Sequence, residues 1–144
     1  MPLLARRSDR VDVLKTVPLF SGLSLKQLNE LARNVEEVPV PRGTMLAREG
    51  QAGNEFFVVL EGKAAVRRRG RRIATLGEGD YFGEMSILDG APRSATVAAE
   101  TDGVVLVIRR REFSALLDSV PGLLKKIAVG LSQRLREADE RILG

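Results

Sequence analysis

The chain of 144 residues contains no cysteine, no histidine and no tryptophan, and aromatic residues make up only 4% of it. Without cysteine it can form no disulfide, thiol nucleophile or thiolate metal site, and we expect a cytoplasmic location. Without histidine, a Ser-His-Asp or Cys-His mechanism is excluded, and a transition metal would depend on carboxylates alone. We therefore predict no enzymatic activity, no catalytic residues, no bound metal and no cofactor.

Long apolar runs are missing as well. No stretch of about 18 apolar residues occurs, so we expect no membrane-spanning helix. Hydrophobic residues make up 44% of the chain and charged residues 29%, the balance of a globular domain. We expect one domain over residues 1–144, and both a stand-alone protein and a segment of a longer one fit this expectation.

Positive charge is unevenly distributed, although the net charge is only +4. Five arginines, at positions 67, 68, 69, 71 and 72, surround Gly70. Such a run can contact nucleic acid, but no aromatic residues alternate with these arginines. Because Gly70 separates two strand-like runs, we predict the exposed tip of a β-hairpin and no nucleic-acid partner.

Residues 9–34 have a helical pattern that Pro18 interrupts. Ser24 followed by Gln27 predicts a capping box at the start of a second helix. Beyond residue 35 the pattern changes to short apolar or alternating runs separated by glycine, which favours a sandwich or barrel over residues 35–109. The predicted strands are Val35–Val40, Met45–Arg48, Glu55–Leu60, Ala64–Arg68, Arg72–Leu76, Ala95–Ala98 and Val104–Ile108.

Residues 110–143 return to a helical pattern, and Pro121 predicts the first turn of the last helix. Six apolar residues recur along this helix at spacings of three and four, which predicts one amphipathic stripe. The stripe could pack on the β-structure, cover a ligand or form the seam of a homodimer. Its members are Leu124, Ile127, Leu131, Leu135, Ala138 and Ile142.

The segment from Phe82 to Val97 has the most specific pattern in the chain. Gly83 and Glu84 stand at a predicted helix start, where unpaired N–H groups and the helix dipole favour an anion. Nine residues after Glu84, Arg93 supplies a fork of donors that matches phosphate oxygens. A carboxylate beside a phosphate needs its own partner, such as a sugar hydroxyl. The segment therefore predicts a nucleotide site, the alternative being a surface ion pair between Glu84 and Arg93.

This segment closely resembles the phosphate-binding cassette of the cyclic nucleotide-binding domain family. Phe-Gly-Glu, a short apolar turn and Pro-Arg-Ser-Ala-Thr-Val follow one another with the family's spacing, and residues 49–62 resemble its second, glycine-flanked signature. The resemblance implies a mainly β fold: an eight-stranded β-roll or jelly roll, an N-terminal helical bundle over residues 9–34, and the family's B and C helices as a lid over residues 110–143.

The resemblance also implies individual roles. Glu84 would accept a hydrogen bond from the ribose 2′-OH, Arg93 would pair with the cyclic phosphate, and Arg134 would contact the base. The remaining ligand-binding residues are predicted in two groups. Those in the cassette are Gly83, Met85, Ser86, Ser94 and Ala95. Those on the strand facing the base are Ala64 and Val66.

The sequence thus predicts a cyclic-nucleotide sensor whose C-terminal helix moves on binding, with cyclic AMP as the ligand. Three alternatives stay open: a β-roll interaction module that binds no nucleotide, a sensor that prefers cyclic GMP, and a phosphodiesterase. No effector domain or partner protein is identifiable, and a homodimer through the C-terminal helix is one form the protein could take.

Overall fold

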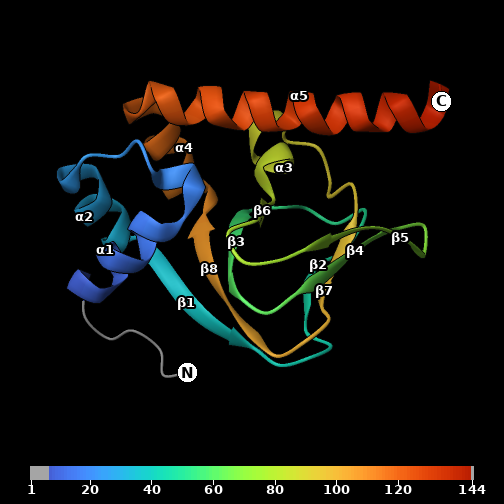
Figure 1. Ribbon diagram of the computed structural model, residues 1–144, viewed down its shortest axis with the longest axis horizontal. Helices are drawn as coiled ribbons and strands as arrows, with labels where there is room; N and C mark the ends of the chain where they lie inside the picture. The colour runs from blue at the N-terminus through green and yellow to red at the C-terminus, as the bar shows by residue number, and fades with distance from the viewer. Residues whose placement is uncertain (1–6, 144) are drawn as a thin grey trace.

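Two four-stranded antiparallel sheets and their flanking helices form the part of the chain that the computed structural model describes, residues 7–143, with side chains from residue 10 to residue 138 (Figure 1). Helices α1 (Arg7–Thr16), η1 (Pro18–Phe20) and α2 (Leu25–Arg33) precede the strands, and α4 (Arg110–Ser119) and α5 (Pro121–Leu143) follow them. Helix α3 (Glu84–Asp89) lies between β6 and β7. The strands are β1 (Val35–Val40), β2 (Met45–Ala47), β3 (Glu55–Glu61), β4 (Ala64–Arg68), β5 (Arg71–Leu76), β6 (Tyr81–Phe82), β7 (Thr96–Ala99) and β8 (Gly103–Arg109).

The strand orders are β1-β8-β3-β6 in one sheet and β2-β7-β4-β5 in the other. Strand β3 is covered on both faces. Successive side chains of a strand point to opposite sides, so Phe56 and Phe57 enter two different cores. Phe56 stacks on Phe113 of α4 at 4.2 Å between ring centroids, within the core formed with the helices. Its neighbour Phe57 stacks on Phe82 at 4.6 Å, within the core between the sheets. The continuous apolar run of β3 follows from this double burial.

The predicted fold class, an eight-stranded roll with helices at both ends, is confirmed. The seven predicted strands all form, with ends shifted by at most one residue. The eighth, β6, was not predicted as a separate strand because two residues are too short to show alternation. It is defined by pairing with β3, where Phe57 lies opposite Phe82 and Val58 opposite Tyr81.

Two local predictions for the N-terminal helices are confirmed. The first helix, α1, ends at Thr16, before Pro18, and a capping box begins α2. The Ser24 side chain accepts a hydrogen bond from the Gln27 amide at 3.2 Å, and the Ser24 amide donates to Gln27 Oε1 at 2.8 Å. This capping box satisfies two donors at the start of α2. None of the helices between residues 7 and 143 has the length and hydrophobicity required to cross a bilayer.

The prediction of one apolar stripe along α5 is wrong in part. Ile127 is fully buried, whereas Leu124 and Leu135 are 46% and 63% exposed, and Leu123 is buried instead of Leu124. Helical geometry explains the split, since the eight positions from Ile127 to Leu135 rotate the side chain by about 80°. The side chain of Ile142 lies outside the described residues.

Candidate functional site

A cavity of about 410 Å³ lies beside the cassette, bounded by strands of the β2-β7-β4-β5 sheet, by α3 and by α5. This volume is within the range of small-molecule sites, about 300 to 1,000 Å³. Nine of the ten predicted ligand-binding residues line it. They are Val66, Gly83, Glu84, Met85, Ser86, Arg93, Ser94, Ala95 and Arg134.

Ala64 is the exception, and its prediction as a base-facing residue is wrong. It is buried in the core between the sheets and does not line the cavity. Ala64 and Val66 share one face of β4, as strand alternation requires. On β4 itself, Val66 lines the cavity, whereas Ala64 is packed within the core between the sheets.

Sequence reasoning missed several lining residues on β5 and α5. Ala74 lies directly opposite Val66 in the hairpin, so the pairing of β4 with β5 could have indicated it. Ile73 and Leu76 of β5 also line the cavity, as do Arg68 and Tyr81. Glu137 and Ala138 line it from α5. No local motif marks these last two, because their position depends on how α5 lies against the roll.

Gly83 sets the geometry of the cassette at the step from β6 to α3. Its φ is +99°, in the left-handed region that favours glycine. A Cβ here would lie 2.6 Å from the carbonyl oxygen of Glu55 and 2.7 Å from Arg93 Nη1. The absence of a side chain therefore permits both the sharp turn into α3 and the close approach of the arginine.

Arg93 is held in a buried position with one donor free. It is only 8% exposed, and its Nη2 donates to the carbonyl oxygen of Glu55 at 2.8 Å. Its Nη1 is buried and has no hydrogen-bond partner among the described residues. Burial lowers the pKa of Arg93, and nearby glutamates oppose this shift. An unpaired buried donor on a cavity wall suits a ligand oxygen.

Glu84 is also buried, at 1% exposure, and its two oxygens differ. Oε1 accepts a hydrogen bond from Arg134 Nη1 at 2.8 Å, whereas Oε2 is buried and unpartnered within the described part of the chain. Burial raises the pKa of the Glu84 carboxyl, and the charge of Arg134 offsets part of this rise. Glu84 thus pairs with Arg134 of α5, and the alternative of a surface ion pair with Arg93 does not hold.

Arg134 ties α5 to the end of the roll. Besides its ion pair with Glu84, its Nη2 donates to the carbonyl oxygen of Tyr81 at 3.1 Å. Its guanidinium lies over the Tyr81 ring, 5.3 Å from the centroid. The structure therefore brings Arg134 to the cavity, as predicted, and adds protein partners that the sequence did not indicate. A contact with a purine base remains a prediction.

The charged residues that line the cavity do not balance. Three arginines, Arg68, Arg93 and Arg134, face two glutamates, Glu84 and Glu137, which leaves a formal excess of one positive charge. A concave site with an excess of one sign attracts ligands of the other sign. The cavity therefore suits an organic anion of low charge.

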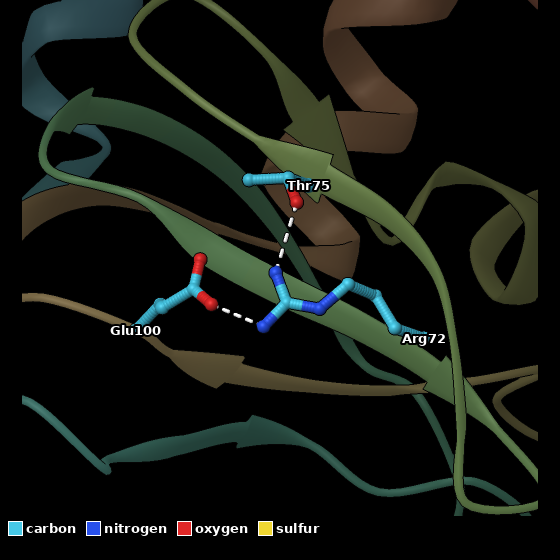
Figure 2. Close-up of polar contacts among 3 residues, drawn as sticks. All are labelled: Arg72, Thr75 and Glu100. Atoms are coloured by element: carbon cyan, nitrogen blue, oxygen red, sulfur yellow. Dashed lines mark hydrogen bonds and ion pairs between the residues drawn. The ribbon is translucent and has the colours of Figure 1, made fainter.

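The arginine-rich segment forms a hairpin tip, as predicted. Arg69 and Gly70 both have positive φ, 53° and 80°, and form the turn between β4 and β5. Figure 2 shows Arg72 of β5 between Thr75 and Glu100, with its Nη1 donating to Thr75 Oγ1 at 3.1 Å and its Nη2 paired with Glu100. The hydrogen bond from Arg72 lowers the pKa of Glu100. One charge of the segment is thus neutralised within the chain.

Comparison with known proteins identifies similar domains. Residues 37–120 match the family model of the cyclic nucleotide-binding domain. The chain is 40% identical over 123 residues to a cAMP-dependent protein kinase regulatory subunit of Yarrowia lipolytica, covering 84% of this chain and 33% of that protein. It is 34% identical over 131 residues to the cyclic AMP receptor protein of Thermus thermophilus, covering 88% and 61%. The chain thus spans about a third of the length of the Yarrowia relative.

Solved structures are also similar to this chain. The structure described as cAMP-bound PfPKA-R superposes with a TM-score of 0.80 at 26% identity, covering 92% of this chain and 47% of that one. The catabolite activator protein of Thermus thermophilus superposes with a TM-score of 0.77 at 34% identity, covering 87% and 61%.

Proposed function

This chain belongs to the cyclic nucleotide-binding domain family, and we propose that it is a non-catalytic sensor domain that binds cyclic AMP in the cavity beside α3 and α5. One observation carries the proposal. Two unpartnered buried atoms belong to residues that line the same cavity: a donor, Arg93 Nη1, and an acceptor, Glu84 Oε2. A nucleotide with an anionic phosphate and a free ribose hydroxyl supplies a partner for each.

In this proposal Arg93 binds the cyclic phosphate by a charge-assisted hydrogen bond. Amide groups at the start of α3, around Gly83, Met85 and Ser86, surround the same oxygens, since first-turn amides have no partner within a helix. Glu84 Oε2 accepts the proton of the ribose 2′-OH. The single negative charge of a cyclic nucleotide also matches the excess positive charge of the cavity lining.

The base lies against the apolar part of the wall, where Val66, Ala74 and Leu76 line the cavity. Cyclic AMP is proposed over cyclic GMP because Ser94 follows the arginine, where guanine-selective members of the family often have threonine. The named ligands of several similar proteins support this choice, since the Yarrowia and Thermus relatives are named for cyclic AMP. A clear preference for cyclic GMP in competition experiments would contradict it.

Binding is coupled to α5 through Arg134 in this proposal. A ligand shifts a conformational equilibrium only if it binds the two states with different affinity. Arg134 joins α5 to Glu84, the residue that the ribose would contact, so ligand binding changes the environment of that ion pair. Coupling free energies of this kind are about 1–3 kcal/mol.

In this proposal, ligand binding changes the position of α5, and a partner detects the changed surface of that helix. Leu124 and Leu135 are exposed on α5, and a second copy of the chain is one partner that could contact them. A cytoplasmic location, expected from the lack of cysteine, belongs to the same proposal.

Calorimetric titration of the chain with cyclic AMP, cyclic GMP and adenosine tests the proposal. We expect cyclic AMP to bind and Arg93→Ala to weaken it by about 2–5 kcal/mol, because a buried anion loses its cation. Arg109→Ala is the matched control, since Arg109 forms an exposed ion pair with Glu36 outside the cavity.

Three results would contradict the proposal. Absence of binding by the unaltered chain would favour the interaction module. Equal affinities for adenosine and cyclic AMP would show that the phosphate is not recognised. Conversion of cyclic AMP to the linear monophosphate would show an enzyme.

A further inference from the structure

Arg68, the last residue of β4, connects the arginine-rich hairpin to the cavity. Its Nε donates to the carbonyl oxygen of Ser94 at 3.0 Å, and the residue lines the cavity although it is solvent-exposed. The contact joins residues 26 positions apart. Arg68 is therefore at the rim of the cavity, next to the residue that follows Arg93.

The backbone around Arg93 is held from two sides. On one side, the Arg93 amide donates to the carbonyl oxygen of Gln51, and the Gly50 amide donates to the carbonyl oxygen of Arg93, both at 2.8 Å. On the other side, the Arg68 guanidinium holds the carbonyl of Ser94. Because Arg93 and Ser94 are adjacent, both sets of contacts restrict the position of the anion-binding arginine.

In the part of the chain that the structure describes, the charge of Arg68, unlike those of Arg72 and Arg134, is not compensated by an ion pair. Arg72 is paired with Glu100 (Figure 2), and Arg134 is paired with Glu84. The hydrogen bond of Arg68 goes to a neutral carbonyl, and no ion pair found among residues 10–138 includes Arg68. Within the described residues, the cavity rim therefore has a positive charge that is not held in an ion pair.

We propose that Arg68 is a positioning and specificity residue of the anion site, which fixes the Arg93–Ser94 segment and attracts the charged ligand into the cavity. This proposal rests on the proposed function, because it assumes that the ligand is a cyclic nucleotide. A charge at the rim of a concave site raises the association rate, and its effect decreases with ionic strength. The hydrogen bond to Ser94 stabilises the bound state and therefore slows dissociation.

Association and dissociation rates of cyclic AMP test this role in three variants of the full chain. Arg68→Gln removes the charge but keeps an N–H donor, and Arg68→Lys keeps the charge. Arg71→Gln is the control: it removes the same charge from the residue directly opposite Arg68 in the hairpin, which does not line the cavity. Adenosine, which has no phosphate, serves as the uncharged probe.

We expect Arg68→Gln to lower the association rate at low salt by about two- to fivefold and to flatten its salt dependence. Arg68→Lys retains the association rate but dissociates faster, because an ammonium does not reproduce the guanidinium contact. Arg71→Gln stays close to the unaltered chain. The affinity for adenosine is the same in the unaltered chain and in Arg68→Gln.

Two outcomes would overturn this proposal alone, in a chain that binds cyclic AMP. One is equal kinetics of Arg68→Gln and Arg71→Gln. The other is a changed ratio of cyclic AMP to cyclic GMP affinity with an unchanged salt dependence, which would make Arg68 a base contact. If the unaltered chain binds neither nucleotide, the proposed function fails and this proposal fails with it.

Discussion

Arg134 Nη1 lies 2.8 Å from Glu84 Oε1, although the two residues are 50 positions apart. The contact joins the last helix to the first residue of α3 and therefore links the C-terminal element to the cassette. It occupies Oε1 of Glu84, whereas Oε2 is buried and has no hydrogen-bond partner in the described part of the chain. The link and the proposed ligand contact thus share one carboxylate.

Removing Arg134 should destabilise the chain. In Arg134→Ala, Glu84 remains buried without its cation, which costs about 3–5 kcal/mol for a fully buried pair. Because the Arg134 side chain is 47% exposed, we expect a smaller loss, about 1–2 kcal/mol in the free energy of unfolding. Urea denaturation measures it, with Arg136→Ala as an exposed control on the same helix. Equal losses in both variants would show that the ion pair does not stabilise the fold.

Gly53→Ala should weaken cyclic AMP binding through Arg93 alone. A Cβ at position 53 would lie 2.5 Å from Arg93 Nε, so the guanidinium must move, while the backbone of Gly53 has no positive φ to strain. Because precise placement of the charge decides the strength of the contact, we expect at least about a tenfold loss of affinity. Gly77→Ala is the control, since its Cβ would meet nothing within 4 Å. Unchanged affinity in Gly53→Ala would contradict the placement of the phosphate at Arg93.

Glu84→Gln should distinguish the ribose from its 2′-deoxy analogue. We expect weaker binding of cyclic AMP but a much smaller change for 2′-deoxy cyclic AMP, because only the former donates a hydroxyl proton to Glu84. The two changes form a double-mutant cycle, measured by calorimetry. A coupling free energy near zero would show that Glu84 does not contact this hydroxyl.

The same variant tests the pKa of Glu84. Burial raises this pKa above the usual 4.5, so the folded chain keeps the proton to higher pH than the unfolded chain does. The stability contributed by the protonated carboxyl is therefore fully present below 4.5 and is lost as the pH rises through the raised pKa.

The amide that replaces the carboxyl in Glu84→Gln cannot ionise, so its contribution to the free energy of unfolding does not change with pH. We expect the unfolding free energy of the unaltered chain, minus that of the variant, to decrease as the pH rises above about 4.5. An increase as the pH rises would mean that the Arg134 ion pair outweighs burial and lowers the pKa of Glu84.

Truncation after Ser132 tests the lid role of α5. The change removes Arg134 and Leu135 but leaves the cassette, so the phosphate can still be bound. We expect the dissociation rate to rise more than the association rate falls, as is usual among variants of one site. Stopped-flow kinetics measures both rates.

Sedimentation of both chains, with and without cyclic AMP, provides the control for assembly. If truncation leaves the dissociation rate unchanged but converts a dimer to a monomer, α5 is an assembly element and not a lid.

Local sequence patterns predicted much of this molecule because they encode short-range structure. The capping box at Ser24, the hairpin tip at Gly70 and the helix start at Pro121 each depend on a few neighbouring residues, and all are present. The cassette belongs to the same class, since its turn, helix and arginine follow one another within one segment. All seven ligand-binding residues predicted within this segment consequently line one cavity.

Contacts between distant segments were decided only by the tertiary structure. Strand β6 exists because it pairs with β3, and Ala64 is buried because the two sheets pack against each other around it. The partner of Glu84 is Arg134 because α5 is rotated so that Ile127 is buried and Leu135 is exposed. That rotation depends on the summed packing of the whole helix against the roll, which no spacing of apolar residues along the chain specifies. The sequence by itself indicated which residues form the proposed anion site, and packing determined which residues surround it.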